Sequence, residues 1–302
     1  MTSTTKTIFE RFEIRKTKKQ KTAFLQWAQP QFQQMGYSVR VEEGNLGVRN
    51  LVVGDVDRAK VIFTAHYDTC ARMPVPNLIT PACISGFIAY QLVMLLLIFG
   101  LAFAMMFAAG CLHPSLIMPA YYISIFGLLA LMLFGPANRH TANDNTSGVT
   151  AIMDLAQAMP EELRGRAAFV LFDLEEMGLI GSSSFAKRHK AQLQQPPVIN
   201  LDCISDGDTL FLGLKKGSRH LLPKLEQAYV SDSRMTTRIF SKHYVYPSDQ
   251  ANFRCGVGVA ALKKGWNGIL YMDRIHTCRD TVYRQENIAF VVEGSIRLTE
   301  SL

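Results

Sequence analysis

A long central segment without any charged side chain is the strongest constraint on this chain. Between Arg72 and Arg139 the sequence contains no Asp, Glu, Lys or Arg. Two apolar stretches lie within it, at residues 84–109 and 116–134, and each approaches or exceeds the roughly 20 residues of a membrane-spanning helix. The intervening "AGCLHPS" combines glycine with proline, which suits a tight turn. We therefore predict a transmembrane hairpin that meets the lipid bilayer through residues 84–134; the alternative is a helical hairpin buried in a soluble core.

The flanking charges predict on which side of the membrane the rest of the chain lies. Both arms of a hairpin return to the same side, so the polar parts share one compartment. The turn lacks Lys and Arg, whereas the N-terminal "RFEIRKTKKQK" is strongly basic, which places the polar domain in the cytoplasm. The net charge of +7 fits proximity to anionic lipid, and no nucleic-acid-binding motif competes for it. We expect no cleavable signal, because "MTSTTKTIFERFEIRK" lacks an apolar core segment.

The remaining sequence alternates between strand-like and helix-like runs, and continuous apolar runs such as "AAFVLF" predict a sheet buried between helices on both faces. The expected strands are residues 37–43, 50–55, 60–66, 167–174, 197–204, 208–214, 237–240, 257–262 and 268–272, and the expected helices are 20–35, 147–159, 181–194, 221–230 and 286–302. We predict an α/β fold in which the hairpin, at residues 73–138, interrupts one domain formed by residues 1–72 and 139–302.

Several predicted strands end in side chains that can bind a metal. These side chains are His66, Asp68, Glu175, Glu176, Asp202 and His276, and Asp144 lies in a "NDNTSG" turn before a helix. Any one of them alone would more often be structural. Ligands of open α/β sheets gather at the carboxyl ends of the strands, so these residues could converge across the long sequence distance. Imidazole and carboxylate ligands together favour zinc, with manganese and cobalt as alternatives.

The sequence lacks the motifs of several other catalytic mechanisms. The sequence has no HExxH for a helix-borne zinc site, no GxSxG for a serine nucleophile and no GxxxxGK[ST] for a phosphate loop. A transporter is disfavoured because two spans without intramembrane charges offer no path for an ion.

Six motifs occur in an order that resembles a known family. "AHYDT", "NDNTSGV", "DLEEMGLIGS", "NLD", "SDQANF" and "RIHTCRDT" are similar to the ordered motifs of the co-catalytic dizinc aminopeptidases, which are the bacterial leucyl aminopeptidases and their glutamate-carboxypeptidase-like relatives. The resemblance covers essentially all of the chain outside the hairpin. It implies a phosphorylase/hydrolase-like fold, in which a mixed β-sheet is sandwiched by helices.

The resemblance also implies a set of metal ligands. Asp144 should bridge two zinc ions, which are the expected cofactors. His66 and Asp202 would complete the site of one ion. Glu176 and His276 would complete the site of the other.

Two further acids have implied roles around these ligands. Asp68 should orient the His66 imidazole, a supporting role whose loss typically costs 10–100-fold in metal affinity or activity. Glu175 should act as the general base. Successive side chains near a strand end point in different directions, so Glu175 can reach a water while Glu176 binds metal.

The sequence departs from the family pattern at two places. A short segment usually separates the His-x-Asp motif from the bridging Asp, but here the hairpin fills the interval between Asp68 and Asp144. An insertion there would bring the active site to the bilayer surface and favour hydrophobic or membrane-bound peptides. Gln250 stands where the family often has His, which affects substrate contacts, and the neighbouring Ser248 and Asp249 are either structural or functional.

These patterns together predict a membrane-anchored dizinc exopeptidase, an aminopeptidase that hydrolyses peptide substrates with water. The alternatives are a carboxypeptidase or another amidohydrolase on the same dizinc core. Glutaminyl cyclases share part of the pattern with one zinc, but the presence of both His66 and Asp68 favours two. A non-catalytic scaffold that has lost its metals is a further alternative, disfavoured because all five ligands and the base are present.

Overall fold

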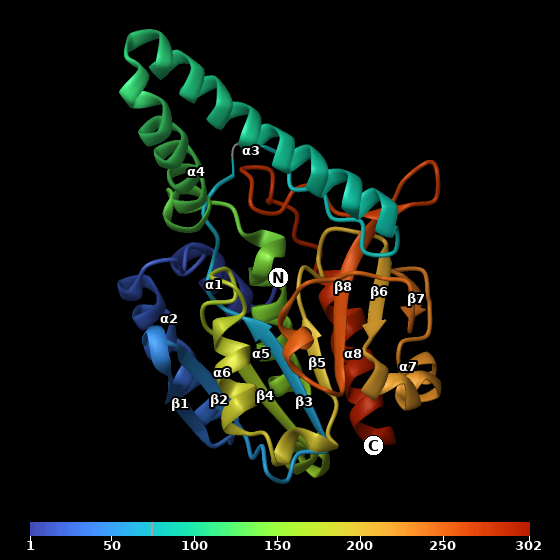
Figure 1. Cartoon of the computed structure of the whole chain (residues 1–302). Coiled ribbons are helices and arrows are strands. Elements are labelled where there is room, and N and C mark those ends of the chain that lie inside the picture. The colour runs from blue at the N-terminus through green and yellow to red at the C-terminus, as the bar shows by residue number, and fades with distance from the viewer. Residues whose placement is uncertain (74) are drawn as a thin grey trace.

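A mixed β-sheet forms the centre of the molecule (Figure 1). The computed structural model describes residues 1–73 and 75–302. The sheet order is β1-β2-β4-β3-β5-β8-β6-β7, with β9 paired to β8, and β4, β3, β5 and β8 are parallel neighbours. Every strand overlaps one of the nine predicted ranges. The strands are β1 (Val39–Glu43), β2 (Arg49–Val53), β3 (Val61–His66), β4 (Ala167–Phe172), β5 (Val198–Leu201), β6 (Thr209–Leu214), β7 (Thr236–Phe240), β8 (Gly256–Lys264) and β9 (Leu270–Tyr271).

Helices cover both faces of this sheet. They are α1 (Ser3–Arg11), α2 (Lys18–Gln34), α5 (Gly148–Ala158), α6 (Ile180–Arg188), α7 (Leu222–Ala228) and α8 (Gln285–Ser301). Successive side chains of a strand point to opposite faces of the sheet. In β4, Phe169 packs in the core shared with α2, α5 and α8, whereas Val170 packs with Phe185 of α6 on the other face. The predicted α/β fold, with helices above and below a mixed sheet, is confirmed.

The predicted helices also occur, with small differences at their ends. The helix expected at residues 181–194 ends at Arg188, and a separate 3-10 turn covers Gln192–Gln194. Helix α1, in which only Thr5 and Ile8 are buried, was not predicted from the sequence. That short polar helix has too few apolar residues to show a helical period. Its start is stabilised locally, because the Thr2 hydroxyl accepts a hydrogen bond from the Thr5 amide at 3.2 Å.

The uncharged segment forms two long helices that project from the sheet domain (Figure 1). They are α3 (Ile84–Leu112) and α4 (Ile117–Phe134), joined through a 3-10 turn at Pro114–Leu116. Both helices are long and apolar enough to cross a membrane. Their side chains face outward, and Ala102 is the only buried residue of α3 and α4. The alternative of a hairpin buried in a soluble core is therefore wrong, because the sheet domain does not cover these helices.

The two ends of the hairpin are paired where they leave the domain. Ala71 and Ala137 form an antiparallel bridge, and the Arg72 amide donates to the Pro136 carbonyl at 2.8 Å. This pairing begins a few residues after β3 ends at His66. The hairpin therefore emerges from the same edge of the sheet at which the predicted metal ligands lie.

Candidate metal centre

The parallel strands bring the predicted ligands to one edge of the sheet. β3, β4 and β5 run in the same direction, with β3 between the other two. Their carboxyl ends deliver side chains from three distant parts of the sequence, namely His66 and Asp68 after β3, Glu175 and Glu176 after β4, and Asp202 after β5. Asp144 comes from the turn before α5, and His276 from the loop between β9 and α8.

Asp144 occupies the middle of this group. Its Oδ1 lies 3.2 Å from His66 Nε2, and its Oδ2 lies 2.9 Å from His276 Nε2. Asp202 Oδ1 lies 3.5 Å from His66 Nε2, and Glu176 Oε2 lies 3.3 Å from His276 Nε2. The structure thus brings all five predicted ligands together as two groups that share the Asp144 carboxylate.

The donor atoms around His66 fit a cation. His66 Nδ1 lies 3.1 Å from the Asp68 carbonyl oxygen. A carbonyl only accepts hydrogen bonds, so the proton belongs on Nδ1 and leaves the Nε2 lone pair facing the carboxylates of Asp144 and Asp202. Donor atoms of these three residues lie within 4.8 Å of one another. A metal ion between them would satisfy a nitrogen lone pair and two carboxylates at once.

The donor atoms around His276 fit a second cation. Glu176 Oε1 is buried and has no hydrogen-bond partner among the described residues, so this carboxylate retains an unused donor atom. Burial raises the pKa of Glu176 to about 8, despite the opposing effect of His276. Burial alone would raise the pKa of Asp144 too, but hydrogen bonds with His276 and His66 lower it. So many acids share this pocket that bound cations would relieve their repulsion.

The Asp68 carboxylate fixes the backbone of Glu175 and Glu176, in addition to the contact between Asp68 and the His66 imidazole. Its Oδ1 accepts a hydrogen bond from the Glu175 amide at 3.0 Å, and its Oδ2 accepts one from the Glu176 amide at 3.3 Å. The carboxylate lies 3.7 Å from His66 Nδ1, which instead donates to the Asp68 carbonyl. Asp68 thereby connects the end of β3 to the end of β4.

Asp280 positions the backbone of Asn143 and Asp144, a role that was not predicted from the sequence. Its two carboxylate oxygens accept hydrogen bonds from the amides of Asn143 and Asp144 at 2.8 and 3.0 Å. Asp280 is 1% exposed, so these two amides replace water around its charge. The only sequence signal was its place in the "RIHTCRDT" motif.

Ser248, Asp249 and Gln250 follow one another in the sequence but have different environments. Ser248 Oγ donates to Asp202 Oδ2 at 2.6 Å, so Ser248 positions this candidate ligand. Gln250 is buried among Asn200 and Tyr246, where its side-chain amide donates to the Tyr246 carbonyl at 2.7 Å. Both oxygens of the buried Asp249 lack a hydrogen-bond partner among the described residues.

Two residues of the basic N-terminal arm are buried inside the domain. The Arg15 guanidinium donates to the carbonyls of Phe12 and Tyr67, both at 2.5 Å, and burial lowers its pKa to about 10. Lys21 forms a buried ion pair with Asp173, with 2.5 Å between Nζ and Oδ1. Arg15 and Lys21 belong to the basic arm that was expected to lie near anionic lipid. Their buried contacts instead stabilise the domain that carries the site.

Comparisons with known proteins place this site among metallopeptidases. The profile of Peptidase family M28 matches residues 126–290, more than half of the chain. The matched range starts within α4, so it excludes His66 and Asp68. No curated protein sequence is significantly similar to this chain.

Solved structures share the fold at low sequence identity. The LapA aminopeptidase of Legionella pneumophila is 15% identical with a TM-score of 0.61, and the match covers 98% of this chain and 69% of that one. A glutaminyl cyclase of Porphyromonas gingivalis is 15% identical with a TM-score of 0.61, covering 98% and 96% of the two chains. A Zn-dependent exopeptidase of Parabacteroides distasonis is 13% identical with a TM-score of 0.59, covering 98% and 97%.

Proposed function

Because the chain belongs to peptidase family M28, we propose that it is a membrane-anchored zinc exopeptidase that removes N-terminal residues from peptides. The position of Asp144 carries this proposal. Its two carboxylate oxygens lie 3.2 Å from His66 Nε2 and 2.9 Å from His276 Nε2. A carboxylate that faces two separate imidazoles suits a ligand shared by two metal ions.

Zinc fits the donor set on both sides of Asp144. His66 and Asp202 would hold one ion, and Glu176 and His276 the other, so that each ion has the nitrogen and oxygen donors that zinc prefers. When bound, zinc acts as a Lewis acid that makes a water more acidic and stabilises negative charge on the carbonyl oxygen under attack.

Glu175 is the residue that would move the proton. Its amide is fixed by Asp68, and its carboxylate lies in one group with donor atoms of His66 and Glu176, all within 4.8 Å of one another. Burial raises the pKa of Glu175 well above its usual value, so its carboxylate is a stronger base than an exposed one. Glu175 would accept a proton from the attacking water and give it to the leaving amine.

A groove beside Glu176 supports hydrophobic or membrane-bound peptides as substrates. It has a volume of about 550 Å³, and its wall includes Leu46 from the β1–β2 connection and Leu133 and Phe134 from the end of α4. Leu46 is 79% exposed and Phe134 is 69% exposed. Apolar groups exposed next to a candidate active site suit an apolar partner. Because α4 forms part of this wall, a substrate in the groove would lie close to the bilayer surface.

The anchoring part of the proposal concerns α3 and α4. Their outward apolar side chains would contact lipid, and the paired ends at Ala71 and Ala137 would hold the peptidase domain against one leaflet. The basic N-terminal arm and the uncharged turn favour the cytoplasmic side. Vesicle flotation tests the anchoring, and protease protection of the domain in inverted membrane vesicles tests its side.

The same dizinc core would also support a carboxypeptidase or another amidohydrolase, because the metals activate water without selecting the substrate. A screen of the purified chain against free and N-acetylated peptides, with and without a chelator, separates these functions. We expect chelator-sensitive release of N-terminal residues that acetylation abolishes, together with two equivalents of bound zinc. Release of C-terminal residues from acetylated peptides would select the carboxypeptidase, and a chain that binds no zinc would indicate a scaffold.

A further inference from the structure

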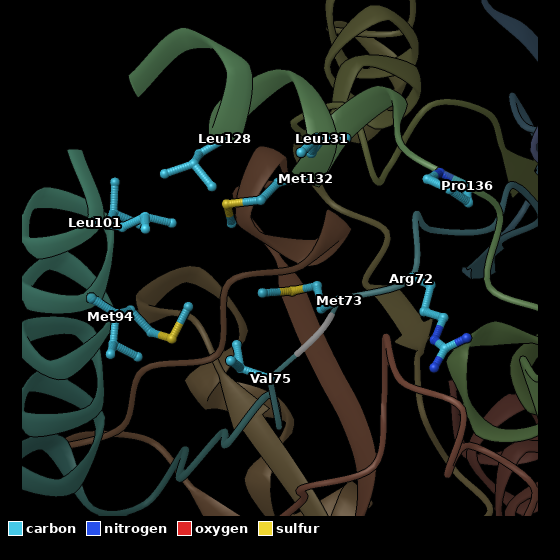
Figure 2. Close-up of a pocket in the computed structure, with 11 residues that line it drawn as sticks. Arg72, Met73, Val75, Met94, Leu101, Leu128, Leu131, Met132 and Pro136 are labelled. Carbon is cyan, nitrogen blue, oxygen red and sulfur yellow. The ribbon is translucent and has the colours of Figure 1, made fainter. Parts of the chain in front are cut away.

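An apolar pocket lies in the fork between α3 and α4, beside the peptidase domain (Figure 2). Its volume is about 270 Å³. Leu101 lines it from α3, Leu128 and Met132 line it from α4, and Met73 and Val75 line it from the segment that leads into α3. We propose that this pocket binds one acyl chain of an anionic phospholipid, a step beyond the proposed membrane anchoring on which it rests.

The fork stays open because the two helices are attached to the domain at separate places. The segment before α3 is fixed by a backbone bridge between Ile79 and Met272. The end of α4 is fixed elsewhere, where Lys16 Nζ donates to the Leu133 carbonyl at 2.7 Å. The helices meet at their turn and spread apart toward the domain (Figure 1). The helices cannot close on the pocket without losing these attachments. The space between the apolar walls must therefore be filled by a group from another molecule.

The lining favours a hydrocarbon chain over a peptide. Arg72 is the only residue with a polar side chain among the described residues that line the pocket. A peptide there would leave most of its backbone N–H and C=O groups without side-chain partners, which is costly in an apolar site. An acyl chain has no such groups, and dry apolar cavities do bind apolar ligands.

Arg72 supplies the charge that selects an anionic headgroup. It lies at the edge of the pocket opposite α3 (Figure 2). Its side chain is exposed, and no acidic side chain in the described part of the chain forms an ion pair with it. A lipid phosphate beside this guanidinium would gain a charge-assisted hydrogen bond, while its acyl chain extends toward Leu101 and Leu128.

The pocket also borders the loop that carries a candidate metal ligand. The Met73 amide donates a hydrogen bond to the His276 carbonyl at 2.7 Å, and the Met73 side chain lines the pocket. A bound acyl chain would therefore pack against the residue that holds the His276 loop in place.

Photo-crosslinking of the full chain in vesicles tests this proposal. The probe is a phosphatidylglycerol with a diazirine near the end of one acyl chain, and mass spectrometry locates the labelled residues. We expect labels around Leu101 and Leu128. Leu101→Trp, which fills the pocket, should lower this labelling about fivefold. Leu96→Trp is the matched control, because Leu96 is 72% exposed on the same helix and does not line the pocket.

A second pair of variants tests the headgroup. Arg72→Gln should lower labelling by the anionic probe about fivefold and leave labelling by a phosphatidylcholine probe unchanged, whereas Arg139→Gln should change neither.

Equal labelling of the two tryptophan variants overturns the proposal, and so does labelling of the pocket by a photoreactive apolar peptide but not by lipid. A chain that does not float with vesicles overturns both the anchoring and the lipid site, whereas one that floats with an unlabelled pocket overturns only the lipid site.

Discussion

Asp68 and Asp280 position the candidate ligands through the same pattern of hydrogen bonds. Each buried carboxylate accepts hydrogen bonds from two consecutive backbone amides, and one amide of each pair belongs to a candidate ligand, Glu176 or Asp144. Charge-assisted hydrogen bonds of this kind are stronger than neutral ones. The backbone of each candidate ligand is therefore fixed by hydrogen bonds that do not use its own carboxylate.

Asp280→Asn should weaken zinc binding. The asparagine oxygen can accept one of the two amide hydrogen bonds, but its NH2 group faces the other amide as a second donor. The resulting displacement of Asp144 should lower zinc affinity by about 10–100-fold, as loss of such supporting contacts typically does. Zinc titration with a competing chelator measures the change. Asp57→Asn, on an exposed turn, is the control, and equal affinity of the two variants would contradict the role of Asp280.

Glu175→Gln should retain zinc and lose turnover. Glutamine keeps the shape of the side chain but cannot accept the proton of the attacking water, so kcat should fall by roughly 10²–10⁴-fold. Metal analysis and steady-state kinetics on one preparation separate the two properties. The exposed Glu162→Gln serves as control. Wild-type rates in Glu175→Gln would refute the assignment.

At the scale of elements, the hairpin lies next to the candidate site and supplies none of its predicted ligands. It is inserted between β3, which carries His66, and the turn that carries Asp144. The end of α4 lines the groove beside Glu176. We therefore expect the hairpin to influence which substrates approach, while the ends of the strands supply most of the candidate catalytic side chains.

Replacing residues 75–134 with a short glycine-serine linker should separate these functions. The Ala71–Ala137 bridge and the hydrogen bond from Met73 to His276 lie outside the replaced segment, so the site should persist. We expect the variant to cleave short soluble peptides at near wild-type rates, to leave the vesicles, and to cleave membrane-tethered peptides at least about tenfold more slowly, because it loses the high effective concentration at the surface. Unchanged cleavage of the tethered peptides would show that the hairpin does not direct substrate choice.

At the scale of the whole molecule, the site joins distant parts of the chain. The candidate ligands range from His66 to His276 and come from strand ends and loops that only the folded sheet brings together. A metal that binds the folded but not the unfolded chain stabilises the fold by mass action.

Chelation should therefore lower the unfolding temperature, and added zinc should restore it. Zinc at about 100 times its Kd contributes roughly 2.7 kcal/mol to the free energy of unfolding. Differential scanning calorimetry at several zinc concentrations measures this dependence. Asp144→Asn, which weakens the shared ligand, should show a smaller zinc-dependent shift. A melting temperature independent of zinc in the wild type would contradict a metal site formed by these residues.

Sequence patterns alone predicted every strand and every α-helix except α1, and they indicated a metal site. Nine strands follow from runs of β-branched and aromatic residues, and the hairpin follows from the absence of charge between Arg72 and Arg139. These properties are local, because backbone preference and hydrophobic periodicity act over a few residues. The ordered motifs then indicated which acids and imidazoles belong together.

Only the tertiary structure decided how these parts contact one another. The hydrogen bonds of Asp280, the burial of Arg15 and the open fork above Met73 depend on segments far apart in sequence. No local pattern distinguishes an acid that binds backbone amides from one that is solvated, or a basic side chain near lipid from one inside the core. Packing and the need to satisfy buried polar groups make that choice, and both act only once the sheet has formed.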